Sequence, residues 1–210
     1  MSELAIVDYG MGNLHSIAKA CEHAGPDQRV RVTRDPAVLA RADRVVFPGV
    51  GAIRHCMEEL ERLALIEPLK RAAAEKPFLG ICLGMQAMLE HSEENEGVDT
   101  LGFIPGRVRR FPAGLEENGV PLKIPHMGWN QVRQSPHPLW AGIPQDTRFY
   151  FVHSYYADPL QPDHVLGRTR YGIEFASAIG RDNLFAVQFH PEKSQQAGLQ
   201  LLANFMTWNP

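Results

Sequence analysis

Apolar residues in the first half of the chain follow two patterns. Short runs such as Leu4–Gly10 are typical of buried strands that end in a turn, whereas Leu14, Ile17, Ala18 and Cys21 recur at the spacing of one helix face. Gly25 and Pro26 stop that helix. The same patterns predict strands at residues 29–33, 44–47 and 78–81, a helical segment from about residue 53 to residue 76, and a helix at residues 85–91.

The second half of the chain has a different pattern. Proline and glycine are dense between residues 101 and 142, where helical periodicity disappears, so we expect short strands and loops. Residues 148–156 predict a strand, and residues 172–190 predict two strands joined at residues 180–183. Gly198, Leu201, Leu202 and Phe205 give a helix at residues 194–208 its apolar face.

Strands that alternate with helices predict a mostly parallel central sheet with helices on both faces, which is a three-layer α/β fold. The second half adds an antiparallel strand extension. With 210 residues and 44% hydrophobic content, the chain can bury a substantial core. We see neither a repeat nor a linker, and therefore expect residues 1–210 to form a single domain.

Charge and composition exclude several functions. The net charge is −3 and basic residues are interspersed with acidic ones, so we expect no nucleic-acid partner. The longest apolar run, residues 78–85, is too short to span a bilayer, and the first residues lack the pattern of a signal peptide. We expect a cytoplasmic protein without a membrane partner. The acidic stretch at residues 90–97 reads as a solvated loop.

The cysteines and histidines do not form a recognisable metal or disulfide pattern. Cys21, Cys56 and Cys82 are odd in number and widely spaced, and the nine histidines show no ligand spacing. We expect neither a metal nor a cofactor.

Gly80-Ile81-Cys82-Leu83-Gly84 places one cysteine between two glycines at a predicted strand-to-helix junction. G-x-C-x-G is the cysteine counterpart of the nucleophile elbow, in which a tight turn exposes the nucleophile. The helix start would favour a thiolate, and the Leu83 N–H would point to a developing oxyanion. The same motif is also compatible with an ordinary tight junction around a buried cysteine. A nearby base would favour catalysis.

The segment FAVQFHPEKS supplies that base. His190 precedes a proline, which favours extended backbone, so Glu192 would lie on the same side of the chain and reach a ring nitrogen. Histidine with a carboxylate partner is the base half of a catalytic triad. Cys82 and His190 both follow predicted strands, and open α/β sheets bind ligands at those strand ends.

Two further segments can contribute to binding. The glycine-rich turn at residues 47–52 could offer N–H groups to an oxyanion or to a substrate carboxylate. The segment HMGWN, residues 126–130, is compatible with either an interface patch or a small satellite cluster of the core.

GICLGMQ with a later FHPE resembles class I, triad-type glutamine amidotransferases over about residues 4–206. DYGMGNLHS, PGVGA, PHMGWN, VHSYY and QFHPEKS resemble, within that family, the glutaminase subunits of imidazole glycerol phosphate synthases. Such subunits hydrolyse glutamine and deliver ammonia to a (β/α)₈ cyclase subunit in histidine biosynthesis. The resemblance thus implies glutamine as substrate and a heterodimer with that cyclase.

The resemblance also assigns roles to matching positions. It implies a triad of Cys82, His190 and Glu192. An oxyanion and glutamine site would comprise Gly49, Val50, Gly51, Leu83, Gln86, Ser154 and Tyr155. Asn13, Met127, Trp129 and Lys193 would face the partner or gate the ammonia.

Two alternatives remain open on the sequence. One is a different cysteine hydrolase, or an amidotransferase of another pathway, on the same fold. The other is a binding module in which Cys82 serves as a redox-sensitive thiol.

Overall fold

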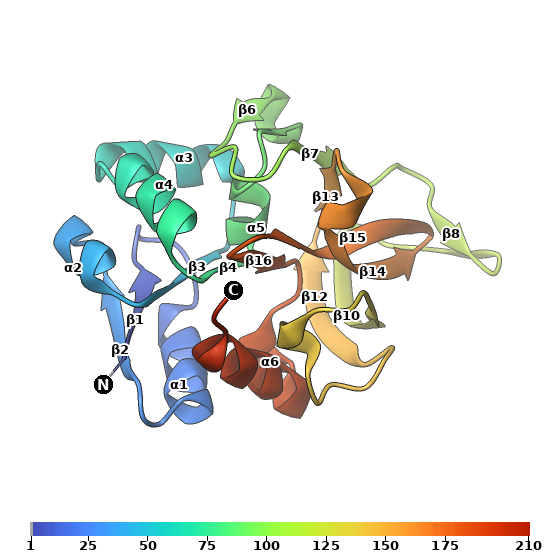
Figure 1. Cartoon of the computed structure of the whole chain (residues 1–210). Coiled ribbons are helices and arrows are strands. Elements are labelled where there is room, and N and C mark those ends of the chain that lie inside the picture. Colours follow the sequence, from blue (N-terminus) through green and yellow to red (C-terminus); the bar gives the residue numbers. More distant parts are fainter. Residues whose placement is uncertain (1) are drawn as a thin grey trace.

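One twelve-stranded sheet connects the two halves of the molecule (Figure 1). The computed structural model describes residues 2–210. Five neighbouring strands form the parallel part of the sheet, in the order β2 (Arg29–Thr33), β1 (Glu3–Val7), β3 (Arg44–Gly49), β4 (Phe78–Cys82) and β16 (Leu184–Val187). The predicted strands at residues 29–33, 44–47 and 78–81 are confirmed.

The second part of the sheet is mostly antiparallel. From β16 it continues through β15 (Ile173–Arg181), β13 (Tyr155–Pro159), β7 (Gly106–Arg110), β5 (His91–Ser92) and β6 (Val98–Asp99), while β14 (Val165–Tyr171) and β11 (Arg133–Gln134) branch from β15. Two separate two-stranded sheets are formed by β10 (His126–Gln131) with β12 (Arg148–His153), and by β8 (Glu116–Glu117) with β9 (Val120–Pro121). The predicted antiparallel extension is therefore confirmed.

Helices cover both faces of the parallel strands (Figure 1). The α-helices are α1 (Leu14–Ala24), α2 (Pro36–Arg41), α3 (Ile53–Arg62), α4 (Ile66–Glu75), α5 (Leu83–Ala87) and α6 (Gln195–Thr207). Short 3₁₀ turns occupy η1 (Glu94–Glu96), η2 (Pro138–Trp140), η3 (Pro162–His164) and η4 (Pro191–Lys193). Among residues 2–210, none of these helices is both long and apolar enough to cross a membrane.

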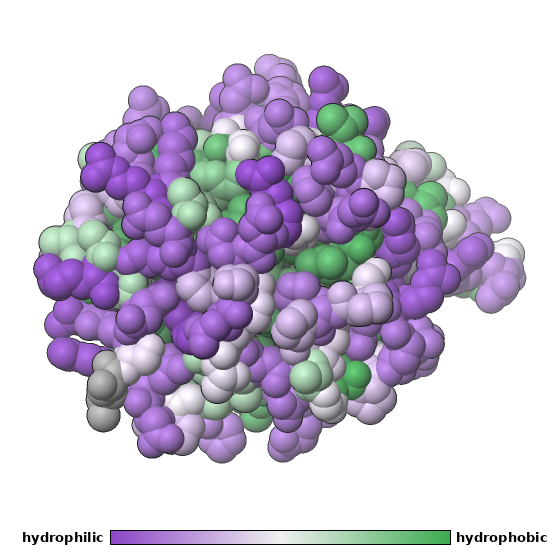
Figure 2. All heavy atoms as spheres, in the orientation of Figure 1, coloured by the Kyte–Doolittle hydropathy of each residue, from purple (hydrophilic) through white to green (hydrophobic). Residues whose placement is uncertain are grey.

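Alternation along the strands divides the core into two clusters, one on each face of the sheet. In β3, Val45 and Phe47 join the cluster that contains residues of α3 and α4, whereas Val46 joins the cluster that contains residues of α1 and α6. Side chains of a strand point alternately to opposite faces, so each fully buried strand serves both clusters. The visible outer surface is mainly hydrophilic (Figure 2).

The predicted helical segment at residues 53–76 is wrong in one respect, because it is two helices. Ala64 has a left-handed φ of 53° and ends α3. Its N–H donates to the Glu61 carbonyl, and the Leu65 N–H donates to the Leu60 carbonyl at 2.8 Å. This is a Schellman ending with alanine at the position where glycine is usual, so no glycine marks the break.

Two other predicted elements are also wrong at their boundaries. The helix expected at residues 85–91 is α5, which starts directly after Cys82 and ends at Ala87, while His91 belongs to β5. The strand expected at residues 148–156 is interrupted at Ser154: β12 pairs with β10, whereas β13 belongs to the large sheet. The chain therefore passes from one sheet to another at Ser154.

Candidate active site

Cys82 is the last residue of β4 and lies directly before α5. Its backbone has φ 55° and ψ −110°, a conformation that residues other than glycine rarely adopt. Such strain is typical of functional sites and agrees with the predicted nucleophile elbow. The residue is only 7% exposed.

The two glycines of the motif allow other groups to approach the elbow closely. A Cβ at Gly84 would overlap the Phe47 carbonyl oxygen, and one at Gly80 would overlap the Met88 sulfur. Neither glycine has a positive φ, so these positions require glycine because of close packing and not because of backbone conformation. The motif thus packs α5 tightly against β3.

The glycine turn lies beside the nucleophile. Gly49, the last residue of β3, is paired with Cys82 in the parallel ladder between β3 and β4. Gly51 in the same turn has φ 95°. Leu83 begins α5, so its N–H belongs to the first helical turn, where amides have no partner within the helix.

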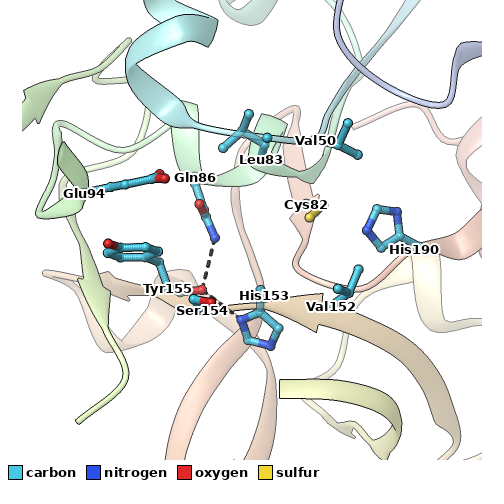
Figure 3. Close-up of a pocket in the computed structure, with 11 residues that line it drawn as sticks. Val50, Cys82, Leu83, Gln86, Glu94, Val152, His153, Ser154, Tyr155 and His190 are labelled. Atoms are coloured by element: carbon cyan, nitrogen blue, oxygen red, sulfur yellow. Dashed lines mark hydrogen bonds between the residues drawn. The ribbon is translucent and has the colours of Figure 1, made fainter. Parts of the chain in front are cut away.

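A cavity of about 270 Å³ opens at Cys82 (Figure 3). Most of the predicted catalytic and binding residues contribute to its wall, together with three that were not predicted. The lining residues are Val50, Gly51, Cys82, Leu83, Gln86, Glu94, Val152, His153, Ser154, Tyr155 and His190. Residues that are far apart in the sequence therefore surround one space.

His190 lies beside the Cys82 sulfur in this cavity (Figure 3), and its Nδ1 is 2.9 Å from Oε1 of Glu192. Both side chains of the pair are almost fully buried, at 3% and 1% exposure. The expected pairing is present, and His190 has the expected extended backbone, with φ −102° and ψ 99°. The expectation that the extended backbone continues to Glu192 is wrong. The strand β16 ends at Val187, and Pro191–Lys193 forms η4, so a 3₁₀ turn brings the carboxylate back to the ring.

The surroundings of His190 favour its charged form. Burial lowers its pKa, but the Cys82 sulfur and then the Glu192 carboxylate outweigh burial and raise the pKa to about 10. Nε2 of His190 is buried and makes no hydrogen bond within residues 2–210. A cationic imidazole next to a cysteine favours the thiolate, which is the nucleophilic form.

Amide side chains connect the nucleophile to the far wall of the cavity. Gln188 Nε2 lies 3.8 Å from the Cys82 sulfur, and the Gln188 Oε1 accepts a hydrogen bond from Gln86 Nε2 at 3.0 Å. Gln86 Nε2 also donates to the Tyr155 carbonyl at 3.0 Å. The orientation of Gln86 is thus fixed by two acceptors.

The residues expected at a partner surface lie outside the cavity lining. Met127 and Trp129, both in β10, are 61% and 42% exposed. The Lys193 ammonium lies 5.8 Å from the centre of the Tyr150 ring, which also contacts the Trp129 ring. Asn13 caps α1 by accepting from the Ser16 N–H at 3.4 Å. The structure therefore groups Trp129 and Lys193 around Tyr150.

Sequence reasoning missed Glu94, Val152 and His153. Glu94 lies in the acidic stretch at residues 90–97, for which a solvated loop was expected. That expectation is wrong for Glu94, because its carboxylate lines the cavity and accepts from the Ile53 N–H at 3.1 Å. Nothing in the composition of the stretch distinguishes Glu94 from its acidic neighbours.

The chain matches known proteins over almost its whole length. The sequence profile described as "Glutamine amidotransferase class-I" matches residues 5–208. The chain is 62% identical to the imidazole glycerol phosphate synthase subunit HisH of Methylococcus capsulatus, over all of this chain and 98% of the relative. It is 58% identical to the protein of the same name from Pseudomonas putida, over all of this chain and 99% of the relative.

Solved structures share the fold. A putative GMP synthase protein from Thermoplasma acidophilum aligns with a TM-score of 0.71 at 20% identity, covering 98% of this chain and 92% of that one. The PurLQS structure from Thermotoga maritima aligns with a TM-score of 0.71 at 14% identity, covering 98% and 97%. The predicted fold class is confirmed. The chain belongs to the class-I glutamine amidotransferase family, within which it groups with the HisH subunits of imidazole glycerol phosphate synthase.

Proposed function

We propose that this protein is the glutaminase subunit of an imidazole glycerol phosphate synthase and hydrolyses glutamine to glutamate and ammonia for histidine biosynthesis. One observation carries the proposal: Cys82 stands at a strained strand-to-helix turn in the same cavity as His190, which is hydrogen-bonded to Glu192. This is the arrangement of nucleophile, base and orienting carboxylate that acyl transfer requires.

In the first half of the reaction, the Cys82 thiolate attacks the side-chain amide carbon of glutamine. The Leu83 N–H and the N–H groups of the Gly49–Gly51 turn would stabilise the oxyanion that develops. The His190 imidazolium then gives a proton to the departing nitrogen, the carbon–nitrogen bond breaks, and ammonia leaves behind a thioester.

In the second half, neutral His190 takes a proton from water, whose oxygen attacks the thioester. The carbon–sulfur bond breaks and glutamate leaves. The Cys82 thiolate and the His190 imidazolium are thereby regenerated. Glu192 holds the imidazole in its working orientation throughout. The sum is one glutamine and one water converted to one glutamate and one ammonia.

The opposite wall of the cavity would hold the amino acid end of glutamine. Glu94 offers a carboxylate to an ammonium group, while Gln86 and the backbone of Ser154 and Tyr155 offer polar contacts. Charge-assisted hydrogen bonds of this kind orient a ligand strongly. Glutamine would therefore extend from Glu94 toward Cys82.

We further propose that the ammonia passes to a (β/α)₈ cyclase bound as the second member of a heterodimer. Ammonium is not a nucleophile, so ammonia must leave unprotonated through a water-poor route. Met127 and Trp129 provide exposed apolar surface for such a partner. Asn13 and Lys193 are candidates for the same interface or for the ammonia gate.

Two further assignments accompany this function. The three cysteines are free thiols, which suits the reducing cytoplasm. A single sheet contains strands from both halves of the chain, which supports one glutamine amidotransferase domain over residues 1–210.

The experiment is to measure glutamate and ammonia formed from glutamine by the purified chain, with and without a (β/α)₈ cyclase. We expect weak turnover alone and a large increase with the cyclase. Cys82→Ser should abolish turnover, whereas Cys56→Ala, which removes a buried thiol outside the cavity, should retain it. Full activity of Cys82→Ser, or high turnover by the isolated chain, would contradict the proposal.

A further inference from the structure

Two buried histidines join the exposed strand β10 to the cavity wall. Nδ1 of His126 is 2.9 Å from Nε2 of His153, and Nδ1 of His153 is 2.8 Å from the Tyr155 carbonyl oxygen. At the other end, Nδ2 of Asn130 is 3.2 Å from Nε2 of His126. Four groups therefore form one continuous hydrogen-bond chain.

The direction of this chain is fixed from both ends. At the cavity end a carbonyl can only accept, so Nδ1 of His153 must carry a hydrogen. At the β10 end, the amide of Asn130 is oriented by two backbone groups. Its Oδ1 accepts from the Gln131 N–H at 2.8 Å, and its Nδ2 donates to the Arg170 carbonyl at 2.8 Å. The second Nδ2 hydrogen therefore points to Nε2 of His126.

Both ends require the same tautomer in each ring. Nε2 of His126 accepts, so its Nδ1 donates to Nε2 of His153, whose Nδ1 in turn donates to Tyr155. An additional proton on either ring would place two donors opposite each other. The geometry therefore requires two neutral imidazoles with the hydrogen on Nδ1.

The environment of the rings favours neutrality. Burial lowers the pKa of His126 to about 4. Burial also lowers the pKa of His153 to about 3, with further lowering by the charge of His190, although the bond to the Tyr155 carbonyl raises it. His126 stacks on Phe151 and Tyr171, with ring centres 5.0 and 4.1 Å apart.

The hydrogen-bond chain ends at the Tyr155 carbonyl, which orients Gln86 in the wall of the cavity. The Tyr155 carbonyl accepts from both His153 and Gln86, and Gln86 continues through Gln188 to the Cys82 sulfur. His153 is also the last residue of β12, directly before the interruption at Ser154. Its bond to Tyr155 therefore fixes the backbone where the chain changes sheets (Figure 3).

We propose that His126 and His153 are positioning residues for glutamine binding. Their one-way hydrogen-bond chain from Asn130 holds the Tyr155 carbonyl, and with it the Gln86 amide, in the orientation that receives the substrate. The proposal rests on the proposed function. It assigns a role to two histidines that take no part in the triad chemistry. It also connects the exposed face of β10, which carries Met127 and Trp129, to the substrate wall.

The first experiment follows alkylation of Cys82 by the glutamine analogue 6-diazo-5-oxo-L-norleucine in the full chain. His126→Phe keeps the ring packing but removes both hydrogen bonds. We expect its half-saturating reagent concentration to rise roughly tenfold, which is the loss expected if the misplaced wall makes one hydrogen bond fewer to the reagent. The limiting rate should change less than about threefold. His126→Asn, which places an N–H near the Nδ1 position, should restore most of the affinity.

His137→Phe is the matched control. His137 is another histidine whose pKa burial lowers to about 4, and its ring packs on Phe185, but it does not line the cavity. We expect it to leave both kinetic parameters unchanged. Wild-type half-saturation in His126→Phe, or equal weakening in His126→Asn and His126→Phe, would overturn the proposal. Failure of the wild-type chain to react at Cys82 would instead contradict the proposed function.

The second experiment needs no variant. Long-range ¹H–¹⁵N NMR of the wild-type chain at pH 6.5 reports the tautomer of each imidazole. We expect both His126 and His153 to be neutral with the hydrogen on Nδ1. A cationic ring, or a hydrogen on Nε2 of either residue, would overturn the proposal even if His126→Phe failed to fold.

Discussion

The hydroxyl of Tyr9 donates a hydrogen bond to the carbonyl of Pro48 at 3.0 Å. Tyr9 is fully buried, and a Cβ at Gly49 would overlap the same hydroxyl, so the phenol supports the glycine turn from inside the protein. The turn beside Cys82 is thus held by a side chain that follows the C-terminal end of β1, as well as by the β3–β4 ladder.

Tyr9→Phe should destabilise the protein by about 1–3 kcal/mol, because it leaves the Pro48 carbonyl without this donor in the core. Urea unfolding monitored by circular dichroism measures the change. Tyr156→Phe is the control, because the Tyr156 ring is only partly buried and its hydroxyl makes no hydrogen bond within residues 2–210. Equal midpoints for the two variants would show that the Tyr9 bond contributes little.

Only one of the three cysteines should react in the native protein. Burial raises the pKa of Cys21 and of Cys56 to about 12, whereas Cys82 lines the cavity. Iodoacetamide at pH 7.5 should therefore add one group, detected by intact mass, and peptide mapping should locate it at Cys82. Cys82→Ser should add none until denaturant is present. Two or more adducts on the folded wild-type chain would contradict this assignment.

Gly84→Ala should destabilise the protein by more than about 3 kcal/mol, because its Cβ would overlap a backbone oxygen that cannot move away. Gly102→Ala provides the comparison: Gly102 has φ 69° but open space around it, so only backbone strain of about 1 kcal/mol is expected. Denaturant midpoints measure both. A Gly84→Ala protein as stable as Gly102→Ala would show that β3 and α5 are not tightly packed.

Glu192→Gln should lower kcat for glutamine hydrolysis roughly 10²- to 10⁴-fold, as expected when an imidazole loses the carboxylate that fixes its tautomer. Removing this carboxylate should also lower the pKa of His190, because the charge helps to hold the proton. The pH dependence of Cys82 alkylation reports that change. An unaltered kcat would show that Glu192 is not a member of the catalytic triad.

Stability should fall as the pH decreases from 6.5. The pKa values of His126, His137 and His153 are about 4, 4 and 3 in the folded chain, compared with 6.5 for an exposed histidine. Between these values the unfolded chain binds more protons, so acid favours unfolding. Their stabilising contribution is present above pH 6.5 and is lost as the pH falls toward 3.

The free energy of unfolding should fall by about 1.4 kcal/mol for each pH unit of acidification through the titration of His153 alone. Urea midpoints between pH 6.5 and 5.0 measure it in a range where most carboxylates remain ionised. His126→Asn should show a shallower slope than the wild type. A midpoint that stays constant over this range would mean that the buried histidines are already charged at pH 6.5.

Local patterns were sufficient to predict the parallel strands and the strand-to-helix turn at Cys82. Residues 29–33 and 44–47 carry β-branched residues between turn signals, and the glycines at 80 and 84 indicate the elbow directly. The triad pairing could be predicted because His190 and Glu192 are separated by only one residue. Its geometry could not, because Pro191 starts a 3₁₀ turn where the pattern predicted extended backbone.

Features that depend on distant contacts could not be predicted. Residues 148–156 read as one strand, because alternation of side chains does not say with which sheet a strand pairs. Ala64 ends a helix without a glycine. The chain of Asn130, His126 and His153 joins strands that are neighbours only in the folded protein. Nothing within the PHMGWN or VHSYY segments alone shows that the rings meet.

The position of β16 between β4 and β15 determines when the active site can first exist. A growing polypeptide emerges from the ribosome with its N-terminal part first. Cys82 is therefore made long before β16 and His190, because residues 83–183 must be synthesised in between. The nascent chain carries its thiol without the imidazole, and the pair of Cys82 and His190 can form only after the late strand β16 inserts beside the early strand β4.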